Sequence, residues 1–569
     1  MVAKDSRFEI ITLSIVLAFC SIVYELLLSN TLALVTGNYV FWQAMTIGIY
    51  VGGLGVGSFK SEKLVDTYKS FMRAELWLSF FGAISVVFVY LFHTLLKYFD
   101  TLIFFTNGNF SSSAYASNMI VAKVMFFLII QSLVFLIGYF SGFEIPLLMR
   151  MRALQTDVNE KEEHFILGIS YLGTLLGTLA FAYILLPKFD VIKTSVFVSS
   201  LNLIVCIYFA YKYNRSQVQK NLVFSGLIFV IIFSVLMNER IITQRFLKFF
   251  YYNQELFSKI NVDLKDSLKK IDRLQDIERI KSDYQYIDFL KVYYKTDIPD
   301  DNPFMMALDT KFQFATNTEL YYHQAFAHIP FILNGSVAKN VLVLGGGDGF
   351  LVRELLKHPE IENIRIIELD IKVVEFAKTR YADRNKNSLS DPRVHLEIND
   401  AFYILRNSKL NYDAIFIDFP YPNNFDLAKL YSVEFYKYVY NALSDNGFVV
   451  FDAPLHKKNE LKKDEDPLSL VNYFNETHYE ANSILQSTVY YAGFKATFPY
   501  SINRESFMFM KKAPSSINLE NLDKFDESKL LPDVVKEIKV LKDYNFPYEI
   551  HKRFVNSLFM PTIFKGDDL

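Results

Sequence analysis

The sequence predicts two structural classes in one chain, a multi-pass α-helical membrane domain followed by an α/β domain. The first observation is uneven hydropathy: the chain has 569 residues, 51% of them hydrophobic, and its long apolar runs lie in residues 1–240. The second is the segment "VLVLGGGDGF" from Val341 to Phe350, where a strand-like run meets a glycine cluster. The third is that a helix-like segment and another apolar run follow, an alternation typical of a parallel sheet covered by helices.

Composition narrows the function classes. The formal net charge is −2, so nothing indicates nucleic acid as a partner. The two cysteines, Cys20 and Cys206, both lie in apolar runs. This placement suits neither a disulfide framework nor a metal site, and we interpret both as small core residues.

Residues 1–240 form the predicted membrane domain. A spanning helix needs about 20 mostly apolar residues. The first candidate is too long for a cleaved signal peptide and has no small-residue cleavage site. Seven stretches qualify: 8–34, 39–59, 74–96, 120–148, 164–186, 190–211 and 221–238.

Glycines recur four residues apart inside two of these stretches. This spacing lets helix backbones approach closely, so we expect helix packing, with a substrate path as the alternative. The pairs are Gly48 with Gly52, Gly53 with Gly57, and Gly173 with Gly177.

Two carboxylates, Glu25 and Glu144, lie inside the predicted spans. An acid at membrane depth is costly and faces the bundle interior or a cavity. Pro146 follows Glu144 closely, so that helix is expected to be kinked or broken. Two interpretations stay open: a cation or proton site, or buried carboxyls that fix helix packing.

The distribution of basic residues predicts a topology. The positive-inside rule places the loops before the first stretch and after the second, fourth and sixth in the cytoplasm. Their basic residues are Lys4, Arg7, Lys60, Lys63, Lys69, Arg73, Arg150, Arg152, Lys212, Arg215 and Lys220. Seven spans would then put the C-terminal part outside, so either one span is miscounted or that part is extracytoplasmic.

Residues 241–283 form a predicted connector. Apolar residues recur every three or four positions over 254–283, which predicts an amphipathic helix. It would either lie on the bilayer or cover the soluble part, and a solvated helix with one packed face is the simpler interpretation.

The glycine cluster indicates a nucleoside-binding turn. Gly345, Gly347 and Gly349 alternate, whereas a dinucleotide fingerprint would need glycine where Phe350 stands. A P-loop is excluded because no Gly-Lys-Ser/Thr follows. The remaining pattern, G-x-G-x-G, is typical of methyltransferase-type folds.

Three acids end successive predicted strands. Glu368 ends the strand "NIRIIE", about 20 residues past the turn, where an acid can take both hydroxyls of a ribose. Asp400 ends "VHLEIND" and is well placed for an adenine amino group, and Asp418 ends "YDAIFID". Because the carboxyl ends of parallel strands meet at one edge, we expect the acids to converge on a ligand. The alternative is that some of them only cap the following helices.

Seven ordered segments resemble the spermidine synthase (polyamine aminopropyltransferase) family, in its membrane-attached bacterial branch. They lie within residues 284–455, and "YELLL" in the first span and "SYLGTLLG" in the fifth also resemble that branch. The segments are "YQ" at 284–285, "LDTKFQFATNTELYYHQAFAH" at 308–328, "GGGDG" at 345–349, "ELD" at 368–370, "ND" at 399–400, "DFPYPNN" at 418–424 and "KLYSVEFY" at 429–436.

The resemblance implies a fold and a set of roles. It implies a small β-rich subdomain at 284–335, a Rossmann-like, methyltransferase-like domain at 336–515 and a C-terminal tail at 516–569. Strand-like pieces after 476, "STVYYAGF" and "SFMFMKK", are expected to complete the sheet. By resemblance, Asp418 is the catalytic acid; the donor and nucleoside contacts are Gln285, Gly345, Gly347, Asp348, Gly349, Glu368, Asp400 and Ala401; and the amine contacts are Tyr322, His323, Asp348 and Tyr421.

The implied reaction fits these residue types. The donor would be decarboxylated S-adenosylmethionine, whose aminopropyl group passes to a diamine such as putrescine, giving spermidine and 5′-methylthioadenosine. Asp418 would take the proton of the attacking amine. The donor carries its own leaving group, so no metal or further cofactor is expected. Asp348 would repel the carboxylate of S-adenosylmethionine, which argues against an ordinary methyltransferase.

Two departures from the family pattern concern the acceptor. Tyr421 stands where the family has a second acid, and Gln324 stands where many relatives have glutamate, so the acceptor site is expected to be less anionic. Two alternatives therefore stay open: another S-adenosylmethionine-type transferase, or a non-catalytic polyamine sensor or transport-linked protein. The expected location is the inner cell membrane, with the enzyme part cytoplasmic from its chemistry, and a homo-oligomer is left open.

Overall fold

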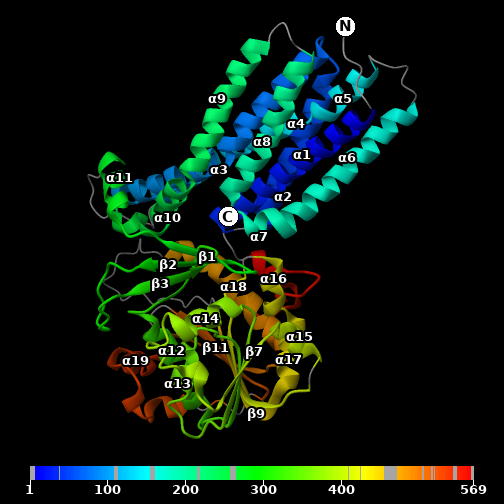
Figure 1. The fold of residues 1–569 in the computed structure, drawn as a ribbon. Helices are drawn as coiled ribbons and strands as arrows, with labels where there is room; N and C mark the ends of the chain where they lie inside the picture. The colour runs from blue at the N-terminus through cyan, green and yellow to red at the C-terminus, as the bar shows by residue number, and fades with distance from the viewer. Residues whose placement is uncertain are drawn as a thin grey trace. The chain divides into compact units, whose positions relative to one another are not determined.

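A computed structural model divides the chain into two compact units, Met1–Ile277 and Glu278–Leu569. Each unit is described by itself, and Figure 1 shows the arrangement of elements within each. The structure describes residues 7–37, 39–107, 113–153, 160–213, 218–256, 264–407, 409–422, 424–453, 471–502, 505–513, 517, 519–541 and 548–565.

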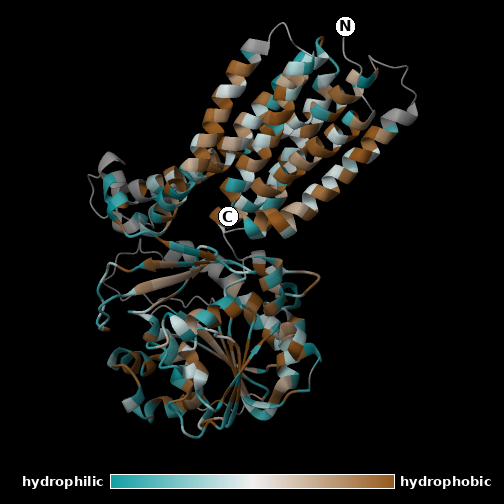
Figure 2. Cartoon of the chain, viewed as in Figure 1, coloured by the Kyte–Doolittle hydropathy of each residue, from teal (hydrophilic) through white to brown (hydrophobic). Residues whose placement is uncertain are grey.

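The first unit is a bundle of long helices. Every one of the seven predicted stretches is helical, and Figure 2 shows that these helices are largely hydrophobic. Among the described residues, six helices are long and apolar enough to cross a membrane, or seven if the bent pair Leu222–Met237 and Glu239–Asn253 counts as one span. The elements are α1 (Arg7–Thr36), α2 (Tyr39–Ser61), α3 (Thr67–Asn107), α4 (Ser113–Ser141), α5 (Glu144–Ala153), α6 (Glu160–Ala180), a π-helical turn (Phe181–Leu185), α7 (Leu186–Lys188), α8 (Val191–Tyr213), α9 (Val218–Met237), α10 (Glu239–Leu256) and α11 (Leu264–Arg273).

The glycine pairs act in packing at two helix contacts. A Cβ on Gly53 or Gly57 of α2 would come within 2.6 Å or 2.0 Å of a backbone oxygen of α4, and one on Gly173 of α6 would come within 2.5 Å of the Ile15 oxygen of α1. Only glycine allows such an approach. Gly48 and Gly52 have nothing within 4 Å, so packing is confirmed for the second pair on α2 but not for the first.

The connector prediction is wrong at its C-terminal end. The amphipathic helix expected to reach residue 283 ends with α11 at Arg273, and strand β1 (Glu278–Lys281) follows. Arg245 of α10 pairs with Asp272 at 3.0 Å, and Lys248 with Asp276 at 2.8 Å. Ion pairs to α10 thus hold the end of the connector, and the alternating residues of β1 pair with β2 instead of continuing a helical face.

The second unit begins with a four-stranded antiparallel sheet in the order β1-β2-β3-β4. The strands are β1 (Glu278–Lys281), β2 (Tyr286–Lys291), β3 (Phe304–Leu308) and β4 (Lys311–Ala315). A small β subdomain is therefore present, but it begins six residues before the expected start at 284. Its last strand leads into α12 (Glu319–Asn334), which ends at Gly335 with a positive φ of 79°.

A seven-stranded sheet forms the centre of the second unit, in the order β10-β11-β9-β8-β5-β6-β7. The five strands from β9 to β7 run parallel, and β11 pairs antiparallel to both β9 and β10. The chain builds outward from β5 on one side through β6 and β7, then returns to the other side with β8. This reversal is the point where open α/β sheets bind ligands.

Helices cover both faces of this sheet, with the apolar core against its strands (Figures 1 and 2). The strands are β5 (Asn340–Gly345), β6 (Asn363–Glu368), β7 (Val394–Ile398), β8 (Tyr412–Asp418), β9 (Leu443–Asp452), β10 (Ala496–Ile502) and β11 (Glu505–Lys511). The helices are α13 (Phe350–Leu355), α14 (Ile371–Thr379), α15 (Ala401–Asn407), α16 (Phe425–Ala428), α17 (Val433–Ala442), α18 (Val471–Ala492) and α19 (Pro532–Ile538).

One of the two strand predictions after residue 476 is wrong. "SFMFMKK" lies in β11 as expected, but "STVYYA" belongs to α18. Leu485, Val489 and Ala492 are buried at spacings of four and three, which is a helical period. The aromatic and β-branched residues of this segment favour a strand locally, and tertiary packing of one helical face outweighs that preference.

Candidate functional site

The glycine turn brings the ends of two strands together. Gly345, Gly346 and Gly349 adopt φ values of 81°, 65° and 79°, which side chains rarely tolerate. A Cβ on Gly345 would lie 2.2 Å from the backbone oxygen of Asp418. The turn after β5 therefore lies directly against the end of β8. This agrees with the prediction that the carboxyl ends of the parallel strands meet at one edge of the sheet.

Glu368 is held by the same turn. Its carboxylate accepts hydrogen bonds from the Gly347 N–H at 3.1 Å and the Asp370 N–H at 2.9 Å. Burial raises its pKa to about 7, although these backbone donors oppose the shift. Gln285 joins the group because its amide donates to Asp370 at 3.1 Å. Two residues predicted on the ribose side, 83 positions apart in sequence, thus meet through Asp370.

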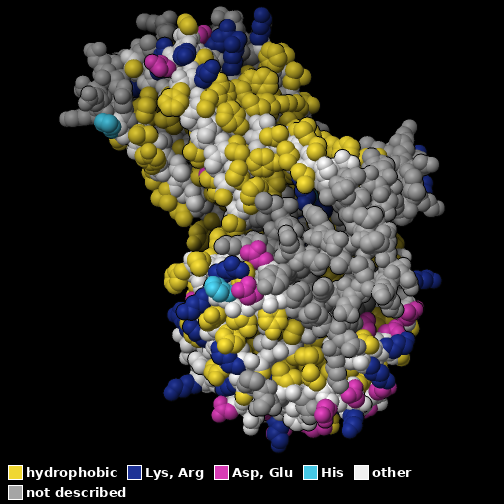
Figure 3. All heavy atoms as spheres, turned by 180° about the vertical axis from the view of Figure 1, so that it is seen from behind, with side chains coloured by type: hydrophobic (Ala, Val, Ile, Leu, Met, Phe, Trp, Pro, Cys, Tyr) yellow, Lys and Arg dark blue, Asp and Glu magenta, His cyan; other side chains and the backbone are white. Residues whose placement is uncertain are grey.

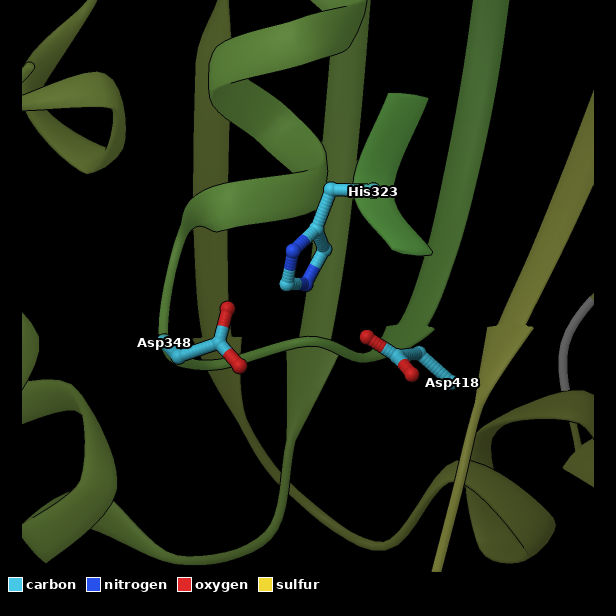
Figure 4. Close-up of side chains that lie close together, drawn as sticks. All are labelled: His323, Asp348 and Asp418. Carbon is cyan, nitrogen blue, oxygen red and sulfur yellow. The ribbon is translucent and has the colours of Figure 1, made fainter. Parts of the chain in front are cut away.

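His323, Asp348 and Asp418 converge at the carboxyl edge of the sheet (Figure 4). One side-chain ligand atom from each lies within 4.8 Å of the others. His323 comes from α12, Asp348 from the turn after β5, and Asp418 from the end of β8. Glu368 lies beside this group, because its carboxylate accepts the N–H of Gly347, the residue before Asp348.

The charges at this site are strongly coupled. Burial and the charge of Asp348 raise the pKa of Asp418 to about 6, and burial raises the pKa of Asp348 as well. For His323, burial lowers the pKa, but Glu319, Asp348 and Asp418 outweigh it, and the net shift is upward. The place between the two aspartates therefore favours a positive charge.

A buried ion-pair network positions His323. Its Nδ1 lies 2.7 Å from a carboxylate oxygen of Glu319, which fixes the ring orientation. Arg353 holds Glu319 through two nitrogen–oxygen contacts of 2.8 Å and 3.0 Å, and contacts Glu354 at 2.9 Å. Sequence reasoning missed this network, because Glu319 and Arg353 lie 34 residues apart and nothing local distinguishes them from surface charges.

Two further acids, Asp452 and Glu505, were also missed. Asp452 ends β9, and the parallel pairing of Ile417 with Phe451 places it beside Asp418 on the neighbouring strand. Burial, Glu505 and Asp418 raise its pKa well above the usual range. The Tyr322 hydroxyl donates to Asp418 at 2.8 Å and also lies against Asp452. An acid at a strand end was the signal used for Asp418, and "VVFD" carries the same signal.

Other predicted residues have different partners in this structure. Asp400 accepts the Phe402 N–H at 2.8 Å at the start of α15 and pairs with Lys429 at 3.2 Å, so it caps a helix here. Ala401 is the first residue of α15 and is buried. Tyr421 lies half-buried in the loop after β8, near Tyr431.

Gln324 makes a structural contact at the edge of this region. Its side-chain oxygen accepts the Leu531 N–H at 2.7 Å, where the chain enters α19. It therefore anchors the C-terminal segment on α12.

A histidine and two aspartates at these distances could also hold a metal ion. Metal ligands must be deprotonated, whereas His323 has an upward-shifted pKa between the two acids. The carboxylates of Asp348 and Asp418 also suit an alkylammonium, which carries a positive charge and donates hydrogen bonds to carboxylates.

Comparison with known proteins places the site in a family. Residues 319–481 match the spermine/spermidine synthase domain. Over these residues the chain is similar to the spermine/spermidine synthase family. The matched residues contain α12, the glycine turn and all five parallel strands, so the family's domain and the converging acids coincide.

Curated relatives extend the similarity beyond that domain. The chain is 27% identical to a polyamine aminopropyltransferase of Oceanobacillus iheyensis over 77% of its own length and 76% of the relative. It is 25% identical to one of Leptospira interrogans over 92% and 94% of the two lengths. A spermidine synthase structure from Thermotoga maritima matches 46% of this chain and 88% of that one, at 26% identity and a TM-score of 0.34.

Proposed function

We propose that this enzyme transfers the aminopropyl group of decarboxylated S-adenosylmethionine to a diamine at Asp418. The convergence of Asp348 and Asp418 beside the turn that holds Glu368 carries the proposal. Glu368 and the backbone of the glycine turn bind the nucleoside. Asp348 binds the donor's amine, and Asp418 receives the acceptor.

The chemistry assigned to Asp418 follows from its environment. A free alkylamine stays protonated up to about pH 10, so the acceptor must lose a proton before it attacks. The acceptor nitrogen forms a bond to the carbon next to the sulfonium sulfur, the carbon–sulfur bond breaks, and 5′-methylthioadenosine leaves. Asp418, with a pKa of about 6, takes the proton as general base. Holding both reactants in line supplies much of the remaining rate.

The acceptor's second ammonium finds its partners in Asp452 and Glu505. Tyr421 supplies no charge in the loop after β8, so the family's second acid is missing there. Asp452 lies beside Asp418, and Glu505 at the start of β11 acts on Asp452. Strands β9 and β11 therefore supply two carboxyls that a bound ammonium would ionise, in place of the acid that the loop lacks. A diamine would extend from Asp418 toward these strands.

Replacing Asp452 with asparagine is expected to raise the KM for the diamine about ten- to a hundredfold, because a hydrogen bond to a charged group contributes about 1.5–3 kcal/mol. Steady-state kinetics with a diamine panel measure this. Asp445→Asn, at the exposed start of the same strand, is the matched control and should leave KM unchanged. An unchanged KM in Asp452→Asn would place the second ammonium elsewhere.

Gly347→Ala is expected to weaken binding of 5′-methylthioadenosine about ten- to a hundredfold. Its Cβ would lie 2.6 Å from Glu368 Cγ, so the carboxylate must move away from the ribose position. Isothermal titration calorimetry measures the affinity. Gly168→Ala, where the added carbon has nothing within 4 Å, is the control; equal affinity in both variants would remove Glu368 from the nucleoside site.

One assay separates this function from its alternatives. Purified full-length protein receives either decarboxylated S-adenosylmethionine or S-adenosylmethionine, with a panel of diamines including putrescine. The expected result is 5′-methylthioadenosine and an aminopropylated amine from the decarboxylated donor only. Turnover of S-adenosylmethionine would indicate another transferase, and binding of both substrates without product would indicate a sensor.

We also propose that the first unit is a multi-pass domain of the inner membrane. Figure 3 shows hydrophobic side chains gathered on one face of this unit. Among the exposed ones are Val124, Leu128, Leu175 and Phe229, which are 50–58% exposed. Exposed apolar surface on this scale is typical of a lipid-facing or partner-facing helix bundle.

The bend between α9 and α10 supports a cytoplasmic enzyme unit. The two helices meet at 58°, and a re-entrant pair would leave six crossings. Both ends of the chain then lie on the side that the basic loops assign to the cytoplasm. We expect a fluorescent protein fused to the C-terminus to be bright and a periplasmic phosphatase fused there to be inactive; the reverse pattern would support seven crossings.

A further inference from the structure

The first unit contains a buried pair of carboxyls that the proposed chemistry does not use. Glu75 of α3 is 0% exposed and Glu144 is 2% exposed. Each acts on the other within hydrogen-bonding reach. Sequence inspection singled out Glu144 but passed over Glu75, which begins a predicted span.

An amide joins the two carboxyls. Asn202 of α8 donates from one nitrogen to Glu75 at 2.7 Å and to Glu144 at 3.3 Å. Its oxygen accepts the hydroxyl of Tyr24 on α1 at 3.2 Å. Ser141 donates to Glu144 at 2.7 Å. Residues of α1, α3, α4, α5 and α8 thus meet at these acids through hydrogen bonds.

One oxygen in this cluster has no partner. Glu75 Oε1 is buried and accepts no hydrogen bond from the described residues, although a buried carboxyl oxygen normally has a donor. The other titratable side chains that interact with the pair are all neutral when protonated. Among the described residues, none of these side chains is a Lys, Arg or His. They are Cys20, Tyr24, Tyr50 and Cys206.

Two ionised carboxylates cannot remain this close in an apolar interior without a positive charge, because repulsion and desolvation both oppose it. A proton suits the geometry better than an alkali cation. The carboxyls already lie within hydrogen-bonding reach, and the Asn202 N–H directed at both would repel a metal ion. A proton on one carboxyl would also supply the donor that the pair lacks.

A two-residue turn interrupts the helix just before Glu144, within the candidate span Ser117–Ala153. α4 ends at Ser141 and α5 begins at Glu144, as Pro146 predicted. Gly138 and Gly142 hold the end of α4 tightly on α2, since a Cβ on either would come within 2.3 Å of a backbone oxygen. Discontinuous helices with ionisable side chains at the break are characteristic of ion sites in transporters.

We propose that Glu75 and Glu144 share one proton that exchanges with water, and that they form the proton-binding site of a proton-coupled transport function in the helical unit. The site is independent of the aminopropyl transfer reaction. Its ligand is the proton alone, and release of that proton would place two negative charges at the break between α4 and α5.

Difference infrared spectroscopy of the full-length protein in lipid vesicles tests the proposal. A protonated-carboxyl band should shift in D₂O, disappear on raising the pH, change in frequency in Glu75→Gln and in Glu144→Gln, and be lost in the double variant Glu75→Gln/Glu144→Gln. Glu25→Gln, another buried acid of the bundle, is the matched control and should keep the band. Fluorescence of Trp77, on the same helix as Glu75, verifies that each variant is folded.

Three results would overturn the proposal. The first is an unchanged band in the double variant, which would assign the proton elsewhere. The second is a band that neither shifts in D₂O nor titrates, which would make the pair a fixed packing contact. The third is displacement of the band by Na⁺ or K⁺ at constant pH, since the ligand would then be an alkali cation. Proton uptake by dye-loaded vesicles under an imposed pH gradient should be reduced to the background of empty vesicles in both Gln variants.

Discussion

Asp418→Asn is expected to lower kcat for aminopropyl transfer by about 10²- to 10⁴-fold, the usual contribution of a positioned general base. Asparagine has nearly the same shape and can still accept the hydrogen bond from Tyr322. It cannot take a proton from the acceptor amine. Binding of 5′-methylthioadenosine should be unchanged, because we assign the nucleoside contacts to Glu368 and the glycine turn, and Asp418 to the acceptor amine. Rapid-quench kinetics and calorimetry measure the two quantities on one preparation.

The same assignment fixes the sign of the pH dependence. Burial and Asp348 raise the pKa of Asp418 to about 6, and the base is active only when ionised. The rate should therefore fall as the pH drops through about 6 and level off above it. Asp348→Asn removes the second cause of the shift, so the acidic limb should move to lower pH.

The control for these kinetics is Asp426→Asn, a change of the same type at an exposed position in α16. It should keep both the wild-type rate and the wild-type pH profile. A loss of less than about tenfold in Asp418→Asn, with the acidic limb in place, would assign the proton transfer to another group.

Arg353→Met is expected to lower the free energy of unfolding of the second unit by about 3–5 kcal/mol, the usual cost of breaking a buried ion pair from one side. Arg353 is 10% exposed and Glu319 is 6% exposed. Burial raises the pKa of Glu319, but His323 and Arg353 outweigh it and the net shift is downward. Without Arg353, Glu319 and Glu354 would retain buried charge with fewer partners, and the orientation of His323 would be lost.

The two units can be followed separately in this experiment. Both tryptophans, Trp42 and Trp77, lie in the first unit, so their fluorescence reports only the helical bundle. Denaturant should release bound 5′-methylthioadenosine earlier in Arg353→Met, while the tryptophan transition stays in place. Lys372→Met removes an exposed ion pair with Glu375 and should change neither transition. An unchanged ligand-release midpoint in Arg353→Met would mean that water already screens Glu319.

The sequence predicted those parts of the site that a local pattern at the end of a single strand indicates. Glycines at 345, 347 and 349 require a tight turn, and acids such as Glu368 and Asp418 follow buried strands, so local pattern alone places them at one edge. Asp348, Tyr322 and His323 followed from the family resemblance. The structure brings all of these together.

What could not be predicted depends on long-range pairing. Glu319 and Arg353 cannot be told from surface charges until α12 and α13 pack together. Glu75 meets Glu144 only when α3, α5 and α8 pack together. The strand-like run "STVYYA" became a helix because one of its faces meets the core. In each case, the deciding contact lies too far along the chain for a local pattern to encode it.

The most direct test of the account is a structure of the full-length enzyme with 5′-methylthioadenosine and a diamine bound. The account predicts that the ribose hydroxyls bond to Glu368, that one amine nitrogen lies within hydrogen-bonding distance of Asp418, and that the other points toward Asp452. A nucleoside bound away from the glycine turn, or a diamine whose nitrogens both avoid Asp418, would contradict it.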